Sequence, residues 1–357
     1  MNKKLFDELV DIISTFPNKK IDFSDASILY SIAQVNRVWP IVRYVVGMQD
    51  TYYDTMNLHY ARLSNCITLF NKLENANISY AIIKGAYLDK VAYGNRGLRD
   101  SKDIDILIER KSNKIIKEFL EEEGFICGYY DYDKCKIIPY SRRTIIYNQL
   151  YTHQSATFVK RIDINNSQNS VRIDINNSAS WAEDIDGIKK TSMMLMHTEL
   201  ISYQDVIFRV LKPDYFLLEL CLHGYRDMNS IILLSENKYS IRLLCDVYYY
   251  ILSQENLLNL DDFFDIVCAL GYGEAVYYIF YYIKCIFNHN DFVQKFLDKA
   301  PESWKMNVNY YGLANGEQKK WNIEFWERIA TDELMKYIEP DLTDNDKQKI
   351  DSIKYNM

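Results

Sequence analysis

Residues 80–109 read YAIIKGAYLDKVAYGNRGLRDSKDIDILIE, and this stretch decides how the rest of the chain is interpreted. It opens with a short apolar run that ends in Lys84-Gly85, which predicts a strand followed by a turn. Gly85 permits a turn that brings backbone N–H groups close to an anion. A helix-like segment and a glycine-containing loop come next. The segment DIDILI then predicts a second strand, whose alternation places Asp103 and Asp105 on one face.

Two carboxylates at positions i and i+2 of one strand suit a divalent metal ion. Their Cα atoms are roughly 6.5 Å apart, so their oxygens can converge on one or two ions. Hard oxygen ligands favour Mg²⁺ or Mn²⁺, which neutralise a triphosphate during transfer. A solvated strand face is the alternative interpretation, but Asp103 and Asp105 repel each other on one face unless a cation lies between them. Lys84, Arg96 and Arg99 are nearby cations for phosphate oxygens.

The motif RIDINNS occurs twice, at residues 161–167 and 172–178. Turn-forming residues separate the strand-like parts of the two copies, which predicts a hairpin of two similar strands. A third carboxylate normally completes a metal site of this kind. Each copy offers one, Asp163 in the first and Asp174 in the second. The residues alone leave the choice between these two open.

A spaced set of residues around the alternating segment forms a recognisable signature: Lys84-Gly85, Leu88, Tyr93-Gly94, Leu98-Arg99 and Asp103-Ile104-Asp105-Ile106-Leu107. Further matches follow along the chain: Leu211-Lys212-Pro213-Asp214, Leu218, Leu220-Cys221-Leu222-His223, Arg242-Leu243 and Asp246. Together they resemble the bacterial nucleotidyltransferase-like family within the DNA polymerase β nucleotidyltransferase superfamily. The resemblance spans about residues 75–250.

The resemblance implies an α+β fold, in which a polymerase β-like mixed sheet is flanked by N-terminal and C-terminal helices. It implies transfer of a nucleoside monophosphate from an NTP to an acceptor hydroxyl, with Mg²⁺ or Mn²⁺ as cofactor and ATP as the expected nucleotide. The implied metal ligands and catalytic residues are Asp103, Asp105 and Asp174. The implied nucleotide-binding residues are Lys84, Gly85, Arg96 and Arg99. The family spacing to the Pro213-Asp214 helix start favours Asp174 over Asp163, and Asp174 would also help to deprotonate the acceptor.

Two positions depart from the superfamily pattern. Ala86 follows Gly85 where Ser or Gly is usual, and Asn176 stands two positions after Asp174 where His is common. These departures motivate an alternative hypothesis, a catalytically inactive member that binds nucleotide or a protein partner. A sheet-and-helix interaction module with no nucleotide site is a third possibility.

The patterns along the whole chain predict three regions. Residues 1–75 have helical spacing, with Ser24 as an N-cap, and residues 189–357 are helical again. The predicted domains are therefore 1–75, 76–188 and 189–357. Predicted strands in the middle region are residues 80–83, 104–108, 125–130, 137–138, 144–147, 157–164 and 171–175. A helix is expected over residues 111–123, stopped by Gly124.

The amino-acid composition favours some classes of partner and cellular location over others. The net charge of −7 over 357 residues favours a small molecule or a protein over RNA as acceptor. The N-terminal residues lack a signal-peptide pattern, and the most apolar run, residues 275–283, is too short to span a membrane. Seven scattered Cys without zinc spacing fit a reducing compartment, so a cytoplasmic protein with no membrane partner is expected. His223 lacks the second His of a zinc helix and is expected to be a hydrogen-bonded structural residue.

Overall fold

The computed structural model describes residues 3–19, 26–164, 167–287 and 290–356. Contacts within the chain define two compact units. Residues 52–219 form the sheet unit, and residues 1–51 with 220–355 form the helical unit. The proposed N-cap Ser24 lies outside the described residues. The three-domain division stays a prediction, because units defined by contacts do not test which segments fold independently.

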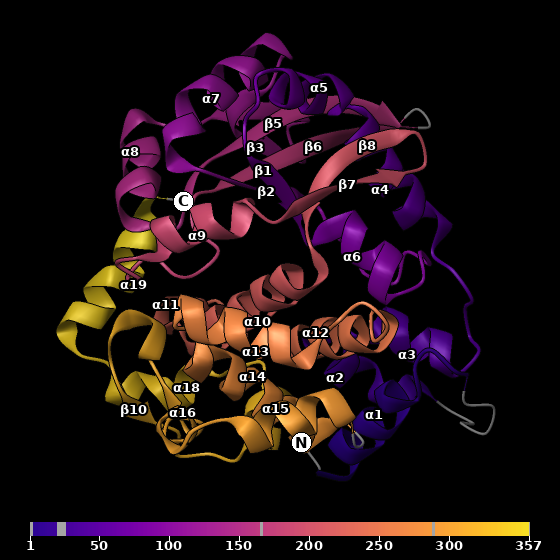
Figure 1. Ribbon diagram of the computed structural model, residues 1–357, viewed down its shortest axis with the longest axis vertical. Helices are drawn as coiled ribbons and strands as arrows, with labels where there is room; N and C mark the ends of the chain where they lie inside the picture. Colours follow the sequence, from indigo (N-terminus) through magenta and orange to yellow (C-terminus); the bar gives the residue numbers. More distant parts are fainter. Residues whose placement is uncertain (1–2, 20–25, 165–166, 288–289, 357) are drawn as a thin grey trace. The chain divides into compact units, whose positions relative to one another are not determined.

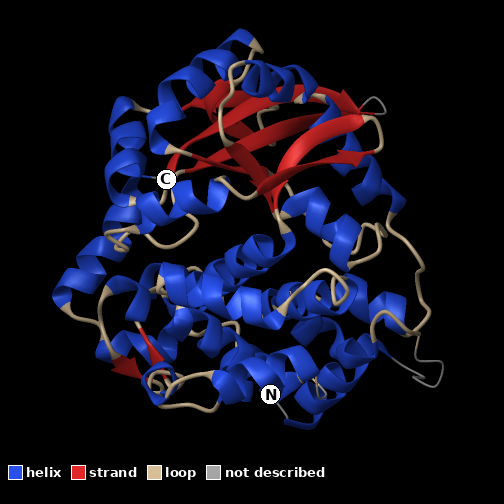
Figure 2. Cartoon of the chain, viewed as in Figure 1, coloured by secondary structure: helices blue, strands red, loops and turns tan. Residues whose placement is uncertain are grey.

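The sheet unit contains a six-stranded sheet (Figure 1). Its strands are β1 Tyr80–Ile83, β2 Ile104–Ile108, β3 Ile126–Asp131, β4 Lys136–Pro139, β5 Gln154–Ile164 and β6 Ser167–Asn176. Their order in the sheet is β1-β2-β6-β5-β3-β4. Strands β2 and β6 are parallel, and the other neighbours are antiparallel. This mixed sheet in a helix-rich chain confirms the predicted α+β class (Figure 2).

The predicted RIDINNS hairpin is confirmed, since β5 and β6 pair antiparallel along their lengths. One predicted strand, residues 144–147, is wrong. It lies inside helix α8 (Arg142–Tyr151), where the Ser141 hydroxyl caps the helix by accepting a hydrogen bond from the Thr144 N–H at 3.1 Å. The cap satisfies one of the N–H groups that a helix start leaves unpaired, and it prevails over the β propensity of the Thr-Ile-Ile run.

The expectation that everything after residue 189 is helical is also wrong for residues 198–211. These form an antiparallel hairpin of β7 (Thr198–Tyr203) and β8 (Val206–Leu211). Val206, Phe208 and Val210 are buried, while the residues between them are more exposed, which is the period of a strand. The alternation was present in the sequence, but it is short and stands between two helices.

Helices surround the strands that carry the predicted site. The remaining helices of the sheet unit are α4 Tyr53–Ser64, α5 Ile67–Asn75, α6 Gly85–Ala92, α7 Asn113–Glu122 and α9 Gly187–Leu195. Helix α4 contacts α6 and β6, helix α6 contacts β1 and β2, and helix α9 contacts β2. Helix α7 ends at Glu122, just before the predicted stop Gly124, which has a positive φ of 81°. The helices therefore cover the strands on which Asp105 and Asp174 lie.

The helical unit joins the two ends of the sequence. Its helices are α1 Lys3–Thr15, α2 Tyr30–Val35, α3 Trp39–Val45, α11 Ile231–Ser235, α12 Ile241–Ser253, α13 Leu260–Leu270, α14 Gly273–Ile286, α15 Asp291–Lys299, α16 Glu302–Lys305, α17 Phe325–Ala330, α18 Met335–Ile338 and α19 Asp344–Asn356, with a short hairpin of β9 Tyr310–Tyr311 and β10 Lys319–Lys320. Helix α10 (Pro213–Asn229) starts at the predicted proline. The buried Asn36 amide donates to the Ile329 carbonyl at 2.8 Å and accepts from the Ile241 N–H at 2.9 Å. These bonds tie the N-terminal helices to segments near α12 and α17.

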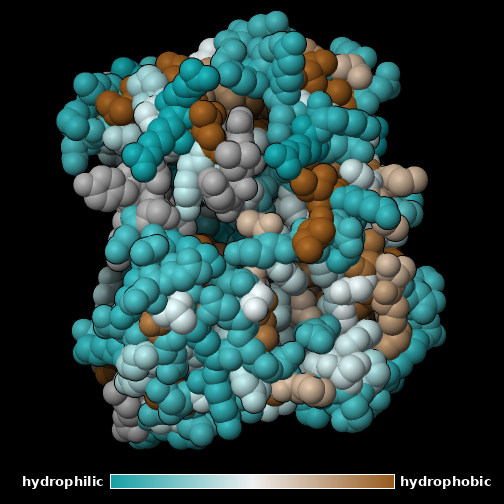
Figure 3. All heavy atoms as spheres, turned by 90° about the vertical axis from the view of Figure 1, so that its left-hand side faces the viewer, coloured by the Kyte–Doolittle hydropathy of each residue, from teal (hydrophilic) through white to brown (hydrophobic). Residues whose placement is uncertain are grey.

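None of the helices in the described part of the chain is long and apolar enough to cross a membrane. On the face shown in Figure 3, hydrophilic residues predominate and hydrophobic residues gather only in small groups. Scattered exposed apolar side chains are ordinary for a folded domain and mark no binding surface by themselves.

Candidate functional site

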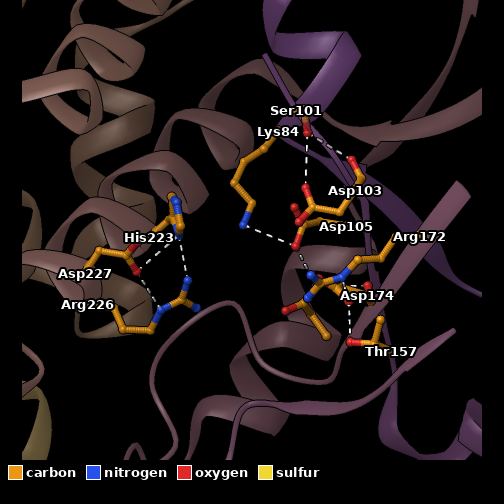
Figure 4. Close-up of polar contacts among 11 residues, drawn as sticks. Lys84, Ser101, Asp103, Asp105, Thr157, Arg172, Asp174, His223, Arg226 and Asp227 are labelled. Carbon is orange, nitrogen blue, oxygen red and sulfur yellow. Dashed lines mark hydrogen bonds and ion pairs between the residues drawn. The ribbon is translucent and has the colours of Figure 1, made fainter. Parts of the chain in front are cut away.

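The turn between β1 and α6 places a lysine against the first carboxylate. Lys84 adopts φ 65° and ψ −144°, and Gly85 follows with φ 57°. A non-glycine residue in this region of φ/ψ space is strained, and such strain is commonly found at functional sites. The Lys84 side chain is buried, and its Nζ lies 3.4 Å from Asp105 Oδ1 (Figure 4). The predicted turn residue therefore contacts the predicted metal strand directly.

The register of the sheet brings Asp105 and Asp174 together. Strands β2 and β6 pair so that Asp105 lies directly opposite Asp174. Neighbouring strands are roughly 4.8 Å apart, so the two carboxylates start from adjacent backbone positions. Asp103 lies one residue before β2 begins, at the same end of the strand. Asp105 and Asp174, which are far apart in the sequence, thus lie side by side, and Asp103 is close to Asp105 in the chain.

Asp174 lies in a polar, buried environment at the middle of the sheet. Its Oδ1 accepts hydrogen bonds from Thr157 Oγ1 at 2.6 Å and from Arg172 Nε at 3.1 Å, and its Oδ2 accepts from Arg172 Nη2 at 3.0 Å. Burial, reinforced by the charges of Asp103 and Asp105, raises the pKa of Asp174 to about 6, although Arg172 and Thr157 oppose this change. Asp174 is therefore suited to exchange a proton near neutral pH.

Asp163, the other candidate, lies elsewhere. It pairs with Gln168 near the end of the β5–β6 hairpin, whereas Thr157 on the same strand pairs with Asp174. Six residues of extended chain separate Asp163 from Thr157, which is about 20 Å. The Asp163 side chain is 70% exposed, and its contact with Arg161 is long, 3.7 Å. The second copy of RIDINNS, and not the first, is beside Asp105.

Two polar side chains contact Asp103 and Asp105. The Asn176 amide donates to Asp105 Oδ1 at 3.3 Å and to the Asp174 carbonyl at 3.2 Å. The Ser101 hydroxyl lies 2.9 Å from the Asp103 carbonyl oxygen and 3.2 Å from its Oδ1. Asn176 was a departure from the family pattern in the sequence, and the structure gives it a contact with a candidate metal ligand.

The predicted phosphate-binding arginines lie in the loop before β2. Arg96 donates to the Tyr93 carbonyl at 3.0 Å, and Arg99 is buried. Both Asp89 oxygens accept backbone N–H groups of this loop, from Gly97 at 2.9 Å and from Arg99 at 3.0 Å. The fully buried Asp89 thus fixes the loop that leads to Asp103, a role that nothing in the linear pattern indicated.

A small cavity lies behind the Lys84-Gly85 turn. It measures about 10 Å³, by a measure in which one water molecule needs roughly 10–15 Å³, so it is too small for a nucleotide. Its walls come from α4, from the end of β1, from the start of α6 and from the loop to β2: His59, Arg62, Leu63, Ile82, Ile83, Gly85, Ala86, Ser101, Asp103, Ile104 and Asp105. No sequence pattern marked His59 and Arg62 as site residues, because they lie on a helix more than 40 residues before Asp103.

A divalent ion is the ligand that the motif predicts at these carboxylates. In the described ranges, no three His, Cys, Asp or Glu side chains are grouped closely enough to hold a metal ion. The carboxylates instead contact Lys84 and Arg172. Their chemistry nevertheless fits Mg²⁺, since all are oxygen donors at neighbouring backbone positions, and their mutual repulsion contributes to the raised pKa of Asp174.

His223 on α10 is hydrogen-bonded within its own helix. Arg226 Nη2 lies 2.6 Å from His223 Nδ1, and Arg226 Nε lies 3.3 Å from Asp227 Oδ1. A guanidinium has no acceptor, so His223 Nδ1 accepts and its proton lies on Nε2. The expectation of a hydrogen-bonded structural histidine is confirmed.

A substitution of Gly85 by alanine tests the turn. An added Cβ meets only ordinary contacts, 3.5 Å from Ser101 Oγ, so the cost comes from the positive φ. We expect the free energy of unfolding to fall by about 1–2 kcal/mol, measured by denaturant titration. Gly124→Ala is the matched control, with φ 81° and open space around it. Both variants should lose similar stability, but only Gly85→Ala should weaken nucleotide binding; equal binding in the two would contradict a phosphate role for the turn.

The chain matches the model of one protein family. Residues 28–288 match the model of a family described as "Uncharacterised nucleotidyltransferase". No curated protein matches the chain. Among solved structures, the chain is similar to the crystal structure of an antigenic nucleotidyltransferase-like protein from Paracoccidioides brasiliensis, at 14% identity and a TM-score of 0.30, over 59% of this chain and 93% of that one.

Proposed function

The chain belongs to the family described as uncharacterised nucleotidyltransferases, and from this premise we propose that it transfers a nucleoside monophosphate from an NTP to an acceptor hydroxyl with the help of a divalent metal ion. The family supports nucleotidyl transfer in general. The proposal adds the divalent metal ion, the identity of the nucleotide and the residues that bind them. They rest on the group of Lys84, Asp103, Asp105 and Asp174.

One observation carries the proposal, the pairing of Asp105 with Asp174 across two parallel strands, with Asp103 at the same strand end. Asp105 and Asp174 are buried, and burial and like charges both disfavour their ionisation, a cost that Lys84 and Arg172 offset only in part, since the pKa of Asp174 is still raised. In a structural role, an apolar or neutral residue would be more stable at position 174. The arrangement is therefore best explained by binding of a cation.

The chemistry is a displacement at the α-phosphate. The acceptor oxygen forms a bond to the α-phosphorus, the bond to the bridging oxygen of the β-phosphate breaks, and pyrophosphate leaves. A bound Mg²⁺ or Mn²⁺ supplies charge neutralisation on the phosphate oxygens. Asp103 and Asp105 would hold the ion, and Asp174 would share it and accept the acceptor's proton, for which its raised pKa is suited.

Lys84 and Gly85 bind the phosphates. Lys84 Nζ contacts Asp105, so its positive charge lies beside that carboxylate. With an ion and a nucleotide bound, Lys84 would contact a phosphate oxygen, and Arg96 and Arg99, in the loop before Asp103, would be the further cations for the phosphates. The Lys84–Asp105 ion pair therefore offsets part of the negative charge of the three carboxylates.

The remaining partners follow from the sequence. We propose ATP as the nucleotide, a small molecule or protein as the acceptor, and a cytoplasmic location. The placement in the DNA polymerase β superfamily and among bacterial members belongs to the same proposal, on the motif from Lys84-Gly85 to Asp103-Ile104-Asp105.

Incubation with each α-labelled NTP tests the activity. The purified protein is given Mg²⁺ or Mn²⁺ and a panel of small-molecule, protein and RNA acceptors, and the label on the acceptor and the released pyrophosphate are measured. Transfer that requires the metal supports the proposal. Nucleotide binding without turnover across the panel would favour the alternative, an inactive member that binds nucleotide or a protein, which the lack of a converged metal group in the described structure also favours.

Metal binding should be visible without any acceptor. We expect about 10 mM Mn²⁺ to raise the melting temperature of the wild-type protein by roughly 2–5 °C at pH 8, because a ligand of the folded state stabilises it. At pH 5 the rise should be smaller, since Asp174 with a pKa of about 6 is then mostly protonated. Differential scanning fluorimetry at both pH values checks this. An equal rise at the two pH values would indicate binding elsewhere on the surface.

A further inference from the structure

Helix α4 contributes two buried polar side chains whose role the reaction does not explain. His59 and Arg62, one turn apart, are 1% and 5% exposed. Both line the small cavity behind the Lys84-Gly85 turn, together with Ser101 and Asp103. Buried polar side chains in a folded protein nearly always have partners, so each exception calls for an explanation.

The two side chains present several atoms without partners. Neither ring nitrogen of His59 has a hydrogen-bond partner among the described residues, and the same holds for Arg62 Nε. Burial, together with the charges of Arg62 and Arg99, lowers the pKa of His59 to about 3. The ring is therefore neutral, with one donor and one acceptor nitrogen. Such a ring can pass a hydrogen bond from one neighbour to another.

Arg62 also has a direct connection to the metal strand. Its Nη1 donates to the Ser101 carbonyl. The hydroxyl of the same Ser101 is within hydrogen-bond distance of the Asp103 carbonyl and carboxylate. Arg62 thereby fixes the backbone position from which Ser101 restrains Asp103.

We propose that His59 and Arg62 are positioning residues for Asp103, and that they act through Ser101 and through one water molecule bound in the cavity between them. The cavity has room for about one water, and its walls offer the polar partners that a buried water needs, namely His59, Arg62, Ser101 and Asp103. The inference rests on the proposed function in one respect, that Asp103 binds the metal.

Other roles for the two residues fit less well. His59 is too buried to touch a substrate, and the cavity is too small to admit a phosphate group. A purely structural role would be satisfied by apolar residues, which would leave no unpaired nitrogen in the interior. Groups that orient a metal ligand, in contrast, are commonly polar and buried, and their loss weakens metal affinity.

The test uses the full chain and Mn²⁺ as probe. His59→Phe keeps the ring volume but removes both nitrogens, and Arg62→Met removes the donors. We expect the Kd for Mn²⁺, measured by electron paramagnetic resonance, to rise about 10–100-fold in each variant. His59→Gln, which retains a donor and an acceptor, should stay within a few fold of wild type. His197→Phe is the matched control, because its ring stacks on Tyr215 at 4.2 Å and can be replaced by another ring.

A crystal structure of the metal-free wild type gives a second readout, which does not depend on the reaction. It should contain a water within hydrogen-bond distance of a His59 nitrogen and of Ser101 or Asp103, and the His59→Phe structure should lack it and show Asp103 turned away from Ser101. If wild type binds no Mn²⁺, the proposed function fails and this readout alone decides the positioning role. A dry cavity, or wild-type Mn²⁺ affinity in both His59→Phe and Arg62→Met, would overturn the inference.

Discussion

Replacing Asp105 with asparagine should abolish nucleotidyl transfer, with a loss in kcat/KM of roughly 10³-fold or more. Asp105 is the carboxylate that faces Asp174 across the sheet and contacts Lys84. On the proposed mechanism, its loss would remove a charged ligand of the ion that neutralises the phosphates, and such contributions to a transition state amount to several kcal/mol. The melting temperature should stay within a few degrees of wild type, because the amide oxygen can still accept from Lys84 and Asn176 while one of three like charges is removed.

Glu109→Gln is the control for Asp105→Asn. Glu109 follows the other end of β2, where it pairs with Lys111 at 2.7 Å. Its replacement changes the charge by the same amount close to the same strand and should leave turnover unchanged. Initial rates with a labelled NTP and Mg²⁺ measure both variants. Turnover retained in Asp105→Asn would contradict the assignment of this strand to the metal.

Asp174→Asn should lose activity and yet stabilise the metal-free protein. Burial and two neighbouring carboxylates raise the pKa of Asp174 to about 6 in the folded state, well above the usual carboxyl value. At a pH between the usual carboxyl pKa and about 6, Asp174 is protonated in the folded state but not in the unfolded state. The free energy of unfolding of the wild type therefore falls as the pH rises through this range. The Asp174→Asn variant has no carboxyl group at this position, so its stability does not fall in this way. We expect it to be more stable than wild type by on the order of 1–3 kcal/mol above pH 6, and by less at pH 4.

The hairpin supplies a matched control in Asp163→Asn. Asp163 has the same local sequence, RIDINNS, and the same Arg two positions before it, but it is exposed. Its replacement should change stability by less than about 0.5 kcal/mol at any pH and should leave transfer intact. Urea denaturation at pH 4, 6 and 8 measures the stabilities. Loss of activity in Asp163→Asn, or a stability difference for Asp174→Asn that does not grow with pH, would contradict the site as described.

Local sequence patterns predicted several elements of the fold and several residues of the candidate site. The alternation at Asp103 to Asp105 and the Lys84-Gly85 turn predicted β2 and the start of α6, because each depends on neighbouring residues only. The RIDINNS copies predicted the hairpin for the same reason. The sequence left the choice between Asp163 and Asp174 open on residues alone, since strand pairing decides it, and pairing joins residues about 70 positions apart.

The parts that were not predicted depend on long-range contacts. His59 and Arg62 reach Ser101 from a helix that precedes the motif, and Thr157 reaches Asp174 from the neighbouring strand. No local pattern marks such residues. The misassigned strand at residues 144–147 has the opposite cause, because its β-forming composition was overridden by the Ser141 cap. The β7–β8 hairpin was missed because its alternation is short.

A crystal structure with Mn²⁺ and a non-hydrolysable NTP analogue tests the central claim most directly. Anomalous scattering locates the manganese without reference to any assumed site. The account predicts an ion about 2.0–2.3 Å from carboxylate oxygens of Asp103 and Asp105, with Asp174 turned toward it, and Lys84 moved from Asp105 to a phosphate oxygen. A nucleotide bound with manganese elsewhere, or bound while Asp105 keeps Lys84 as its partner and no ion is present, would contradict it.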